Sequence, residues 1–119
     1  MLKKSKLYKV RGIFKVLFWI ALIVAYSVAM LPQDSALQIA ALGDKTHHVF
    51  TFIILGVLLR LGYDIKYWYA LSSLVFFGVF IELYQYFTPT RFADINDVIA
   101  DLIGTFIGLK IYKYLHKVI

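Results

Sequence analysis

Seven carboxylates and three histidines stand out in this strongly apolar chain as the side chains able to do chemistry. Two of the histidines, His47 and His48, follow Asp44 at positions i+3 and i+4, so Asp44 and His48 share one helix face. Glu82 and Gln85 are i, i+3 neighbours further along the chain. Carboxylates and imidazoles can serve as general acids, general bases or metal ligands.

A third polar group follows Arg91. Asp94, Asp97 and Asp101 stand at i, i+3 and i+7 and form one stripe along a helix, with Arg91 as the expected countercharge. Its guanidinium suits a carboxylate or a phosphate equally. Asp101 and Glu82 lie a turn or more inside apolar segments, where an ionised carboxylate costs several kcal/mol. Each must therefore be paired, protonated or exposed to a water-filled cavity.

The elements that position these residues are predicted to be membrane helices. Of the 119 residues, 61% are hydrophobic and 17% are charged, and the mean hydropathy is +0.76. A water-soluble domain of this size needs more polar residues to cover its surface. The absence of cysteine excludes a disulfide framework, a zinc-thiolate site and an iron-sulfur cluster. The chain also lacks a P-loop, a nucleotide-binding glycine fingerprint and a Gly-x-Ser-x-Gly elbow.

Four apolar segments predict an all-α fold, an integral membrane four-helix bundle that forms a single domain over residues 1–119. The predicted helices cover approximately residues 13–31, 46–61, 67–87 and 94–115. The fourth has only eight uncharged residues between Asp101 and Lys110, so it must pack against its neighbours. Gly104 and Gly108 give it a small face with the GxxxG spacing of close helix pairs. The N-terminal run also fits a signal peptide with a loose cleavage site at Ser27-Val28-Ala29, but the later segments favour a retained helix.

The basic residues predict the topology. Eleven of the thirteen Lys and Arg fall on one side if the N-terminus is cytoplasmic, which leaves only Lys45 and Arg91 outside. We therefore expect both termini to be cytoplasmic. Lysines at cytoplasmic helix ends that contact anionic headgroups also explain the net charge of +6 without nucleic acid as a partner. Of the carboxylates only Asp64 falls inside, so the polar groups are expected to converge on the outer side.

Several of these polar residues also fit roles in stabilising helices or the membrane interface instead of roles in binding or catalysis. Asp44 fits a helix N-cap, and Asp94 with Asp97 resembles a capping box. Asp97 also complements the dipole of its helix. The two histidines at 47 and 48 also fit donors to lipid headgroups at the interface.

Three motifs in this order resemble those of the VanZ-like family of small bacterial membrane proteins. They are Asp44-Lys45-x-x-His48, Glu82-x-x-Gln85 and Pro89-x-Arg91-x-x-Asp94-x-x-Asp97-x-x-x-Asp101-x-x-Gly104. The resemblance covers roughly residues 43 to 109. It implies a multi-pass protein of the bacterial cytoplasmic membrane, a role in the cell envelope and a possible link to resistance to the glycopeptide teicoplanin. In that family the position of Asp101 is more often Asn, so this chain has an additional carboxyl group.

The first functional hypothesis is an extracytoplasmic polar pocket that binds an anionic lipid or a lipid-linked cell-wall component. Its expected ligand-binding residues are Asp44, Lys45, His48, Glu82, Gln85, Arg91, Asp94, Asp97 and Asp101. The second is an intramembrane hydrolase or transferase that acts on a lipid phosphate, with candidate catalytic residues His48, Glu82, Asp97 and Asp101.

A third hypothesis treats the polar stripe as interhelical contacts that hold together the bundle or a homo-oligomer. A proton-coupled channel or transporter is a further alternative, but four short helices leave little room for one. In a metal-dependent form of the second hypothesis, Glu82, Asp97, Asp101 and His48 would be metal ligands, a set that suits magnesium or manganese and, less specifically, zinc. The residue spacing matches no standard metal motif, so the sequence assigns no metal site and no particular cofactor.

Overall fold

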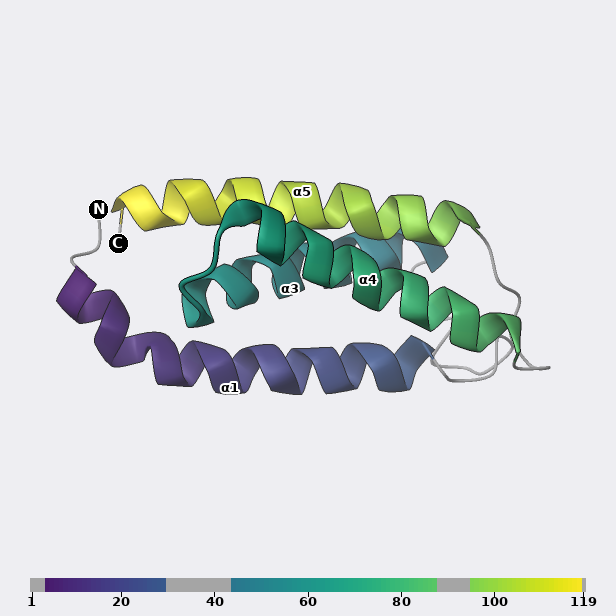
Figure 1. Ribbon diagram of the computed structural model, residues 1–119, viewed down its shortest axis with the longest axis horizontal. Coiled ribbons are helices and arrows are strands. Elements are labelled where there is room, and N and C mark those ends of the chain that lie inside the picture. Colours follow the sequence, from purple (N-terminus) through teal and green to yellow (C-terminus); the bar gives the residue numbers. More distant parts are fainter. Residues whose placement is uncertain (1–3, 30–43, 88–94, 119) are drawn as a thin grey trace.

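The computed structural model describes residues 4–29, 44–87 and 95–118, and all four elements in these ranges are helices (Figure 1). Their bounds are Lys4–Ala29 for α1, Asp44–Gly62 for α3, Tyr67–Tyr86 for α4 and Ile95–Val118 for α5. The predicted all-α class is therefore confirmed for the described residues. The largest difference is in α1, which begins at Lys4 instead of residue 13 because its basic N-terminal segment continues the helix.

The ends of α3 and α4 follow from local sequence. Helix α3 ends at Gly62, the residue type with the lowest helix propensity after proline. Lys66, which precedes α4, has extended backbone angles of −70° and 154°. The other end of α4 comes just before Thr88 and Pro89, because proline disfavours helical backbone at the residue that precedes it.

Helix α3 is the central element of the bundle. It packs most extensively against α5 and also against α1, whereas α4 packs mainly against α5 (Figure 1). The bundle is elongated, with a longest dimension of 48 Å. Its main core consists of Phe18, Ala25, Phe52, Leu55, Leu59, Ala70, Leu71, Leu74 and Leu109.

Close contact between α3 and α5 depends on the two glycines of the predicted small face. A Cβ on Gly104 would meet the carbonyl oxygen of Val49 and the Cβ of Phe52, and a Cβ on Gly108 would meet the carbonyl oxygen of Ile53. The GxxxG prediction is thus confirmed. This contact holds the first turns of α5 beside the first turns of α3.

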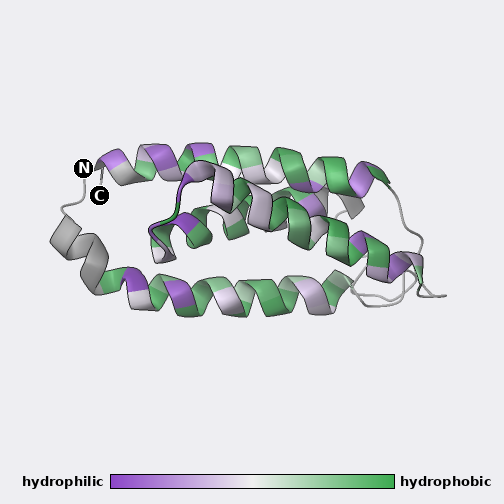
Figure 2. Ribbon diagram, in the orientation of Figure 1, coloured by the Kyte–Doolittle hydropathy of each residue, from purple (hydrophilic) through white to green (hydrophobic). Residues whose placement is uncertain are grey.

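The outer surface of the bundle is apolar. Large hydrophobic side chains are exposed on every described helix, for example Ile23 at 62% on α1 and Phe76 at 73% on α4. Figure 2 shows hydrophobic residues along the middle of the helices and hydrophilic ones at the C-terminal end of α5 and in the turn between α3 and α4. Two helical segments, Val10–Ala29 and Tyr67–Tyr86, are long and apolar enough to cross a membrane, and His48–Gly62 is a shorter apolar segment.

Candidate functional site

Four ionisable side chains from three helices meet at one end of the bundle, and we call them the acid–histidine cluster. They are His48 of α3, Glu82 of α4, and Asp97 and Asp101 of α5. Their exposed fractions are 5%, 8%, 1% and 1%, so all four are buried. The predicted convergence of polar residues from three helices is therefore confirmed for these four.

The imidazole of His48 lies between the two aspartates of α5. Its Nδ1 is 2.6 Å from Oδ1 of Asp101, and its Nε2 is 3.8 Å from Oδ2 of Asp97. A carboxylate accepts a hydrogen bond but does not donate one, so with Asp101 ionised Nδ1 carries the proton and donates it. The bond fixes the orientation of the ring and directs Nε2 toward Asp97.

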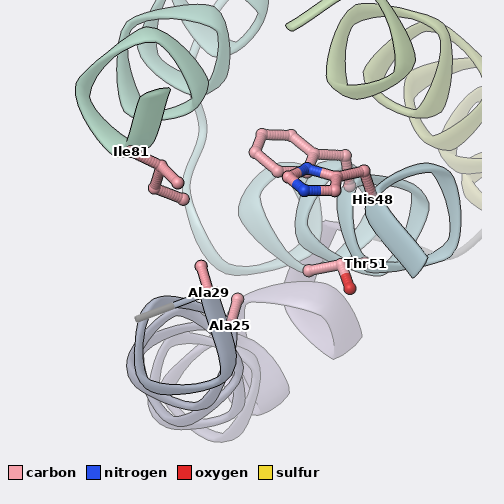
Figure 3. A pocket seen from close by; sticks show the side chains of 6 residues that line it. Ala25, Ala29, His48, Thr51 and Ile81 are labelled. Carbon is pink, nitrogen blue, oxygen red and sulfur yellow. The ribbon is translucent and has the colours of Figure 1, made fainter. Parts of the chain in front are cut away.

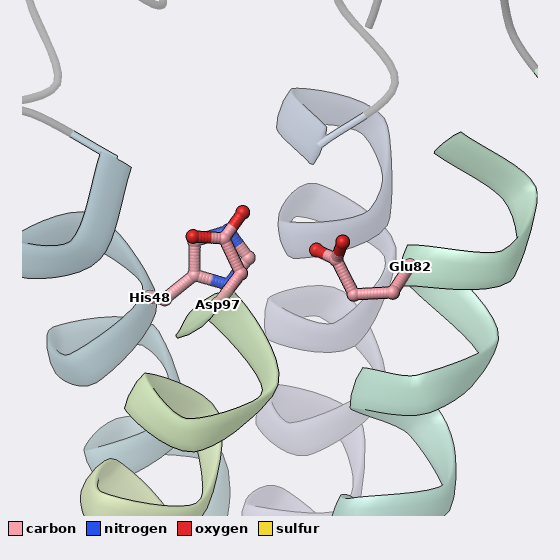
Figure 4. Close-up of side chains that lie close together, drawn as sticks. All are labelled: His48, Glu82 and Asp97. Atoms are coloured by element: carbon pink, nitrogen blue, oxygen red, sulfur yellow. The ribbon is translucent and has the colours of Figure 1, made fainter. Parts of the chain in front are cut away.

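Glu82 completes the cluster from the opposite helix. Figure 4 shows its carboxylate pointing from α4 toward His48 and Asp97. One ligand atom from each of these three residues lies within 4.8 Å of the other two. The rotation of α4 therefore brings Glu82 to the residues of α3 and α5, although it is 34 residues from His48 in the sequence.

Gly78 makes room for Asp101 on the surface of α4. A Cβ at position 78 would lie 2.6 Å from Oδ2 of Asp101. This oxygen is buried and has no hydrogen-bond partner among the described residues, while Thr105 donates a 2.8 Å bond to the backbone oxygen of Asp101. Sequence reasoning did not identify Gly78. The available signal was its position four residues before Glu82, on the same face of α4.

Gln85, a predicted ligand-binding residue, contacts α1. Its Nε2 donates a 2.8 Å hydrogen bond to the carbonyl oxygen of Ala29, the last residue of α1. The last carbonyls of a helix have no partner within the helix, so this bond satisfies one of them. Gln85 is completely buried and joins α4 to the end of α1.

Several predicted site residues cannot be compared with the structure. Arg91 and Asp94 lie outside the described residues, and so do the side chains of Asp44, Lys45 and His47. The backbone of residues 44–47 forms the first turn of α3, which leads directly to the cluster. Their proposed roles remain predictions.

A small pocket beside the cluster lies between α1, α3 and α4 (Figure 3). It has about the volume that one water molecule needs. The alanines on α1 leave this space because their side chains are short. The lining residues are Ala25, Ala29, His48, Thr51, Phe52 and Ile81.

The composition of the cluster determines what it can do chemically. If all three acids were ionised, a protonated His48 would balance only one of their three negative charges. A buried carboxylate is stable only when it is paired with a positive charge, neutralised by a proton or bound to a metal ion. The cluster is therefore suited to bind a cation or to transfer protons, and the bond between His48 and Asp101 also links α3 to α5.

Comparison with known proteins identifies the family. Neither a search of curated proteins nor a search of solved structures gave a match. The family model described as VanZ/LLP1 matches residues 11–116, which is most of the chain and includes the whole acid–histidine cluster. The chain therefore belongs to the VanZ/LLP1 family.

Proposed function

We propose that this VanZ-like protein is a multi-pass protein of the bacterial cytoplasmic membrane with both termini on the cytoplasmic side. The first turn of α1, the last turn of α5 and the turn between α3 and α4 lie at the same end of the bundle (Figure 1). That end carries Arg60, Lys66, Lys110, Lys113 and Lys117. Positive residues are retained on the cytoplasmic side, so the opposite end, with the acid–histidine cluster, faces outward.

We further propose that this outer end binds an anionic lipid or a lipid-linked cell-wall component. The observation that supports a ligand site at this end is the burial of four ionisable side chains in an apolar bundle, because contacts between helices alone do not require three acids around one histidine. Lys45 and Arg91 belong to the same end by their sequence positions. They would supply positive charge for a phosphate. The resemblance to the VanZ-like family implies a role in the cell envelope, where such a ligand would be found.

A lipid-retention experiment tests this proposal. The purified protein in detergent is incubated with phosphatidylglycerol, a long-chain polyprenyl phosphate or phosphatidylcholine, and the bound lipid is measured by native mass spectrometry. We expect the two anionic lipids to be retained preferentially. Arg91→Lys should weaken lipid retention because lysine lacks the planar guanidinium group of arginine. Glu82→Gln should alter lipid retention by changing the charge of the cluster.

Asp64→Asn is the matched control, since it makes the same change from carboxyl to amide at the other end of the bundle, where Asp64 is exposed. Equal retention of all three lipids would contradict the proposal, and so would wild-type retention by both Arg91→Lys and Glu82→Gln. A link to teicoplanin is tested by measuring susceptibility of cells that express these variants, normalised to the amount of protein in the membrane. A phenotype that only follows protein amount would favour a structural role for the cluster.

The hydrogen bond between His48 and Asp101 favours a second candidate function, hydrolysis of a lipid phosphate. A carboxylate that orients an imidazole is the arrangement by which histidine acts as a general base. Nε2 of His48 would remove a proton from water as the water oxygen bonds to phosphorus. The bond from phosphorus to the lipid oxygen would break, and the imidazolium would return the proton to that oxygen.

Release of inorganic phosphate from the polyprenyl phosphate distinguishes this candidate from binding alone. An enzyme releases phosphate over many turnovers, and His48→Gln abolishes the release while Asp64→Asn does not. Retention of the lipid without phosphate release by the wild type would reject hydrolysis and leave the binding proposal intact.

A further inference from the structure

We propose that the acid–histidine cluster binds one zinc ion, with Nε2 of His48 and one carboxylate oxygen each from Glu82 and Asp97 as ligands. Asp101 is a positioning residue that acts through His48. The proposal shares its cluster with the proposed lipid binding and excludes the general-base role of His48, because Nε2 cannot hold a metal ion and accept a proton at the same time. Metal binding is measured without lipid, so the two proposals can fail separately.

The distances between the ligand atoms fit a single ion. Zinc lies about 2.0–2.2 Å from nitrogen and oxygen ligands, so two ligands of one ion are separated by roughly 3 to 4 Å. Nε2 of His48 and Oδ2 of Asp97 are 3.8 Å apart, within this range and too far apart for a good hydrogen bond. One ligand atom from each of His48, Glu82 and Asp97 lies within 4.8 Å of the other two, so small side-chain rotations can bring three ligand atoms around one ion.

The contact between His48 and Asp101 is typical of a metal-binding histidine. Such a histidine usually donates its other ring N–H to a carboxylate or a carbonyl, which fixes the ring and raises the basicity of the ligating nitrogen. Here Nδ1 of His48 meets Oδ1 of Asp101 at 2.6 Å, on the opposite edge of the ring from the proposed ligand atom. Gly78 allows Asp101 to occupy this position against α4.

Charge also favours a divalent cation. The proposed ligand set contains two carboxylates, Glu82 and Asp97, and the third carboxylate of the cluster, Asp101, is bonded to His48. An ion of this kind would also attract a phosphate to a group of acids that would otherwise repel it. A bound metal ion would therefore allow an anionic headgroup to bind beside a cluster of acids.

The ligand types favour zinc over magnesium and calcium. One imidazole nitrogen with two carboxylate oxygens is a mixed set that suits zinc, whereas magnesium and calcium prefer oxygen ligands alone. Three protein ligands leave a fourth position for water or substrate, as in catalytic zinc sites.

The test begins with the wild-type protein, purified in detergent without an affinity tag and treated with a chelator. It is dialysed against buffered zinc, and the bound metal is measured by mass spectrometry of the element. We expect one zinc ion per chain, and X-ray absorption at the zinc edge should detect an imidazole among oxygen ligands. A wild-type protein that retains no zinc, or a spectrum without imidazole, overturns the proposal whatever the variants do.

Variants then assign the ligands. His48→Gln, Glu82→Gln and Asp97→Asn should each abolish stoichiometric binding, whereas Asp64→Asn should bind zinc as the wild type does. Asp101→Ala should weaken zinc affinity about 10- to 100-fold, and Asp101→Asn, which keeps an oxygen acceptor for His48, should recover part of the loss. Helical circular dichroism and a single peak on gel filtration establish that each variant is folded. Zinc affinity at the wild-type level in folded His48→Gln overturns the assignment.

Discussion

Alanine in place of Gly104 is expected to separate α3 from α5 and thereby to loosen the acid–histidine cluster. The added Cβ would lie 3.0 Å from the Cβ of Phe52 and even closer to the carbonyl oxygen of Val49. Carbon atoms pack best at about 3.5–4.0 Å, so the helices must move apart by roughly half an ångström or more. Backbone atoms of α3 form part of this contact, and they cannot rotate away as a flexible side chain would.

The size of the effect follows from two opposing contributions. Overpacking of a well-packed contact costs about 1–3 kcal/mol. Replacing glycine with alanine inside a helix favours folding by about 1 kcal/mol through helix propensity. Gly12 of α1 is the matched control, because a Cβ there meets no atom within 4 Å. The propensity contribution cancels between the two variants, so Gly104→Ala should be less stable than Gly12→Ala by about 1–3 kcal/mol.

The free energy of unfolding of each variant can be measured by titration with denaturing detergent, followed by circular dichroism. The same displacement would lengthen the 2.6 Å contact between His48 and Asp101, so Gly104→Ala should also bind zinc less tightly than Gly12→Ala. The reasoning is refuted if Gly104→Ala is as stable as Gly12→Ala. That outcome would mean that α3 and α5 are not held at the distance described.

Two further predictions concern the end of α1 and the topology. Gln85→Leu removes the 2.8 Å hydrogen bond to the carbonyl oxygen of Ala29 at the buried end of α1. The variant should have a free energy of unfolding lower by about 1–3 kcal/mol in the same titration. An unchanged free energy of unfolding would show that this bond contributes no stability. Because the chain has no cysteine, Asp64→Cys and Thr90→Cys can report topology in intact cells. A membrane-impermeant maleimide should label Thr90→Cys directly and Asp64→Cys only after permeabilisation, and the reverse pattern would mean that the orientation is wrong.

The sequence was sufficient to predict the helices, because their signals are local. Long apolar runs and the breaks at Gly62 and Pro89 predict the helix bounds to within a few residues, except at the start of α1. The glycine spacing at positions 104 and 108 predicted a close helix contact without naming the partner. The same spacing rules placed Asp97 and Asp101 on one face of their helix, which the structure confirms.

The contacts between helices required the tertiary structure. Sequence spacing did not pair Asp101 with His48, which is 53 residues away in the sequence, and the expected countercharge Arg91 lies outside the described residues. Spacing fixes which residues of one helix share a face but leaves the rotation of each helix and its partner undetermined. Gly78 belongs to none of the sequence motifs, and it matters only because Asp101 packs against it.

The sequence by itself therefore determined the apolar helical class, the small face of α5 and the set of polar residues available for chemistry. Only the tertiary structure decided that His48, Glu82 and Asp97 meet within 4.8 Å and that Asp101 orients the imidazole. The physical reason is that helix formation depends on residues within a few turns, whereas the site depends on the packing of α3 and α4 against α5.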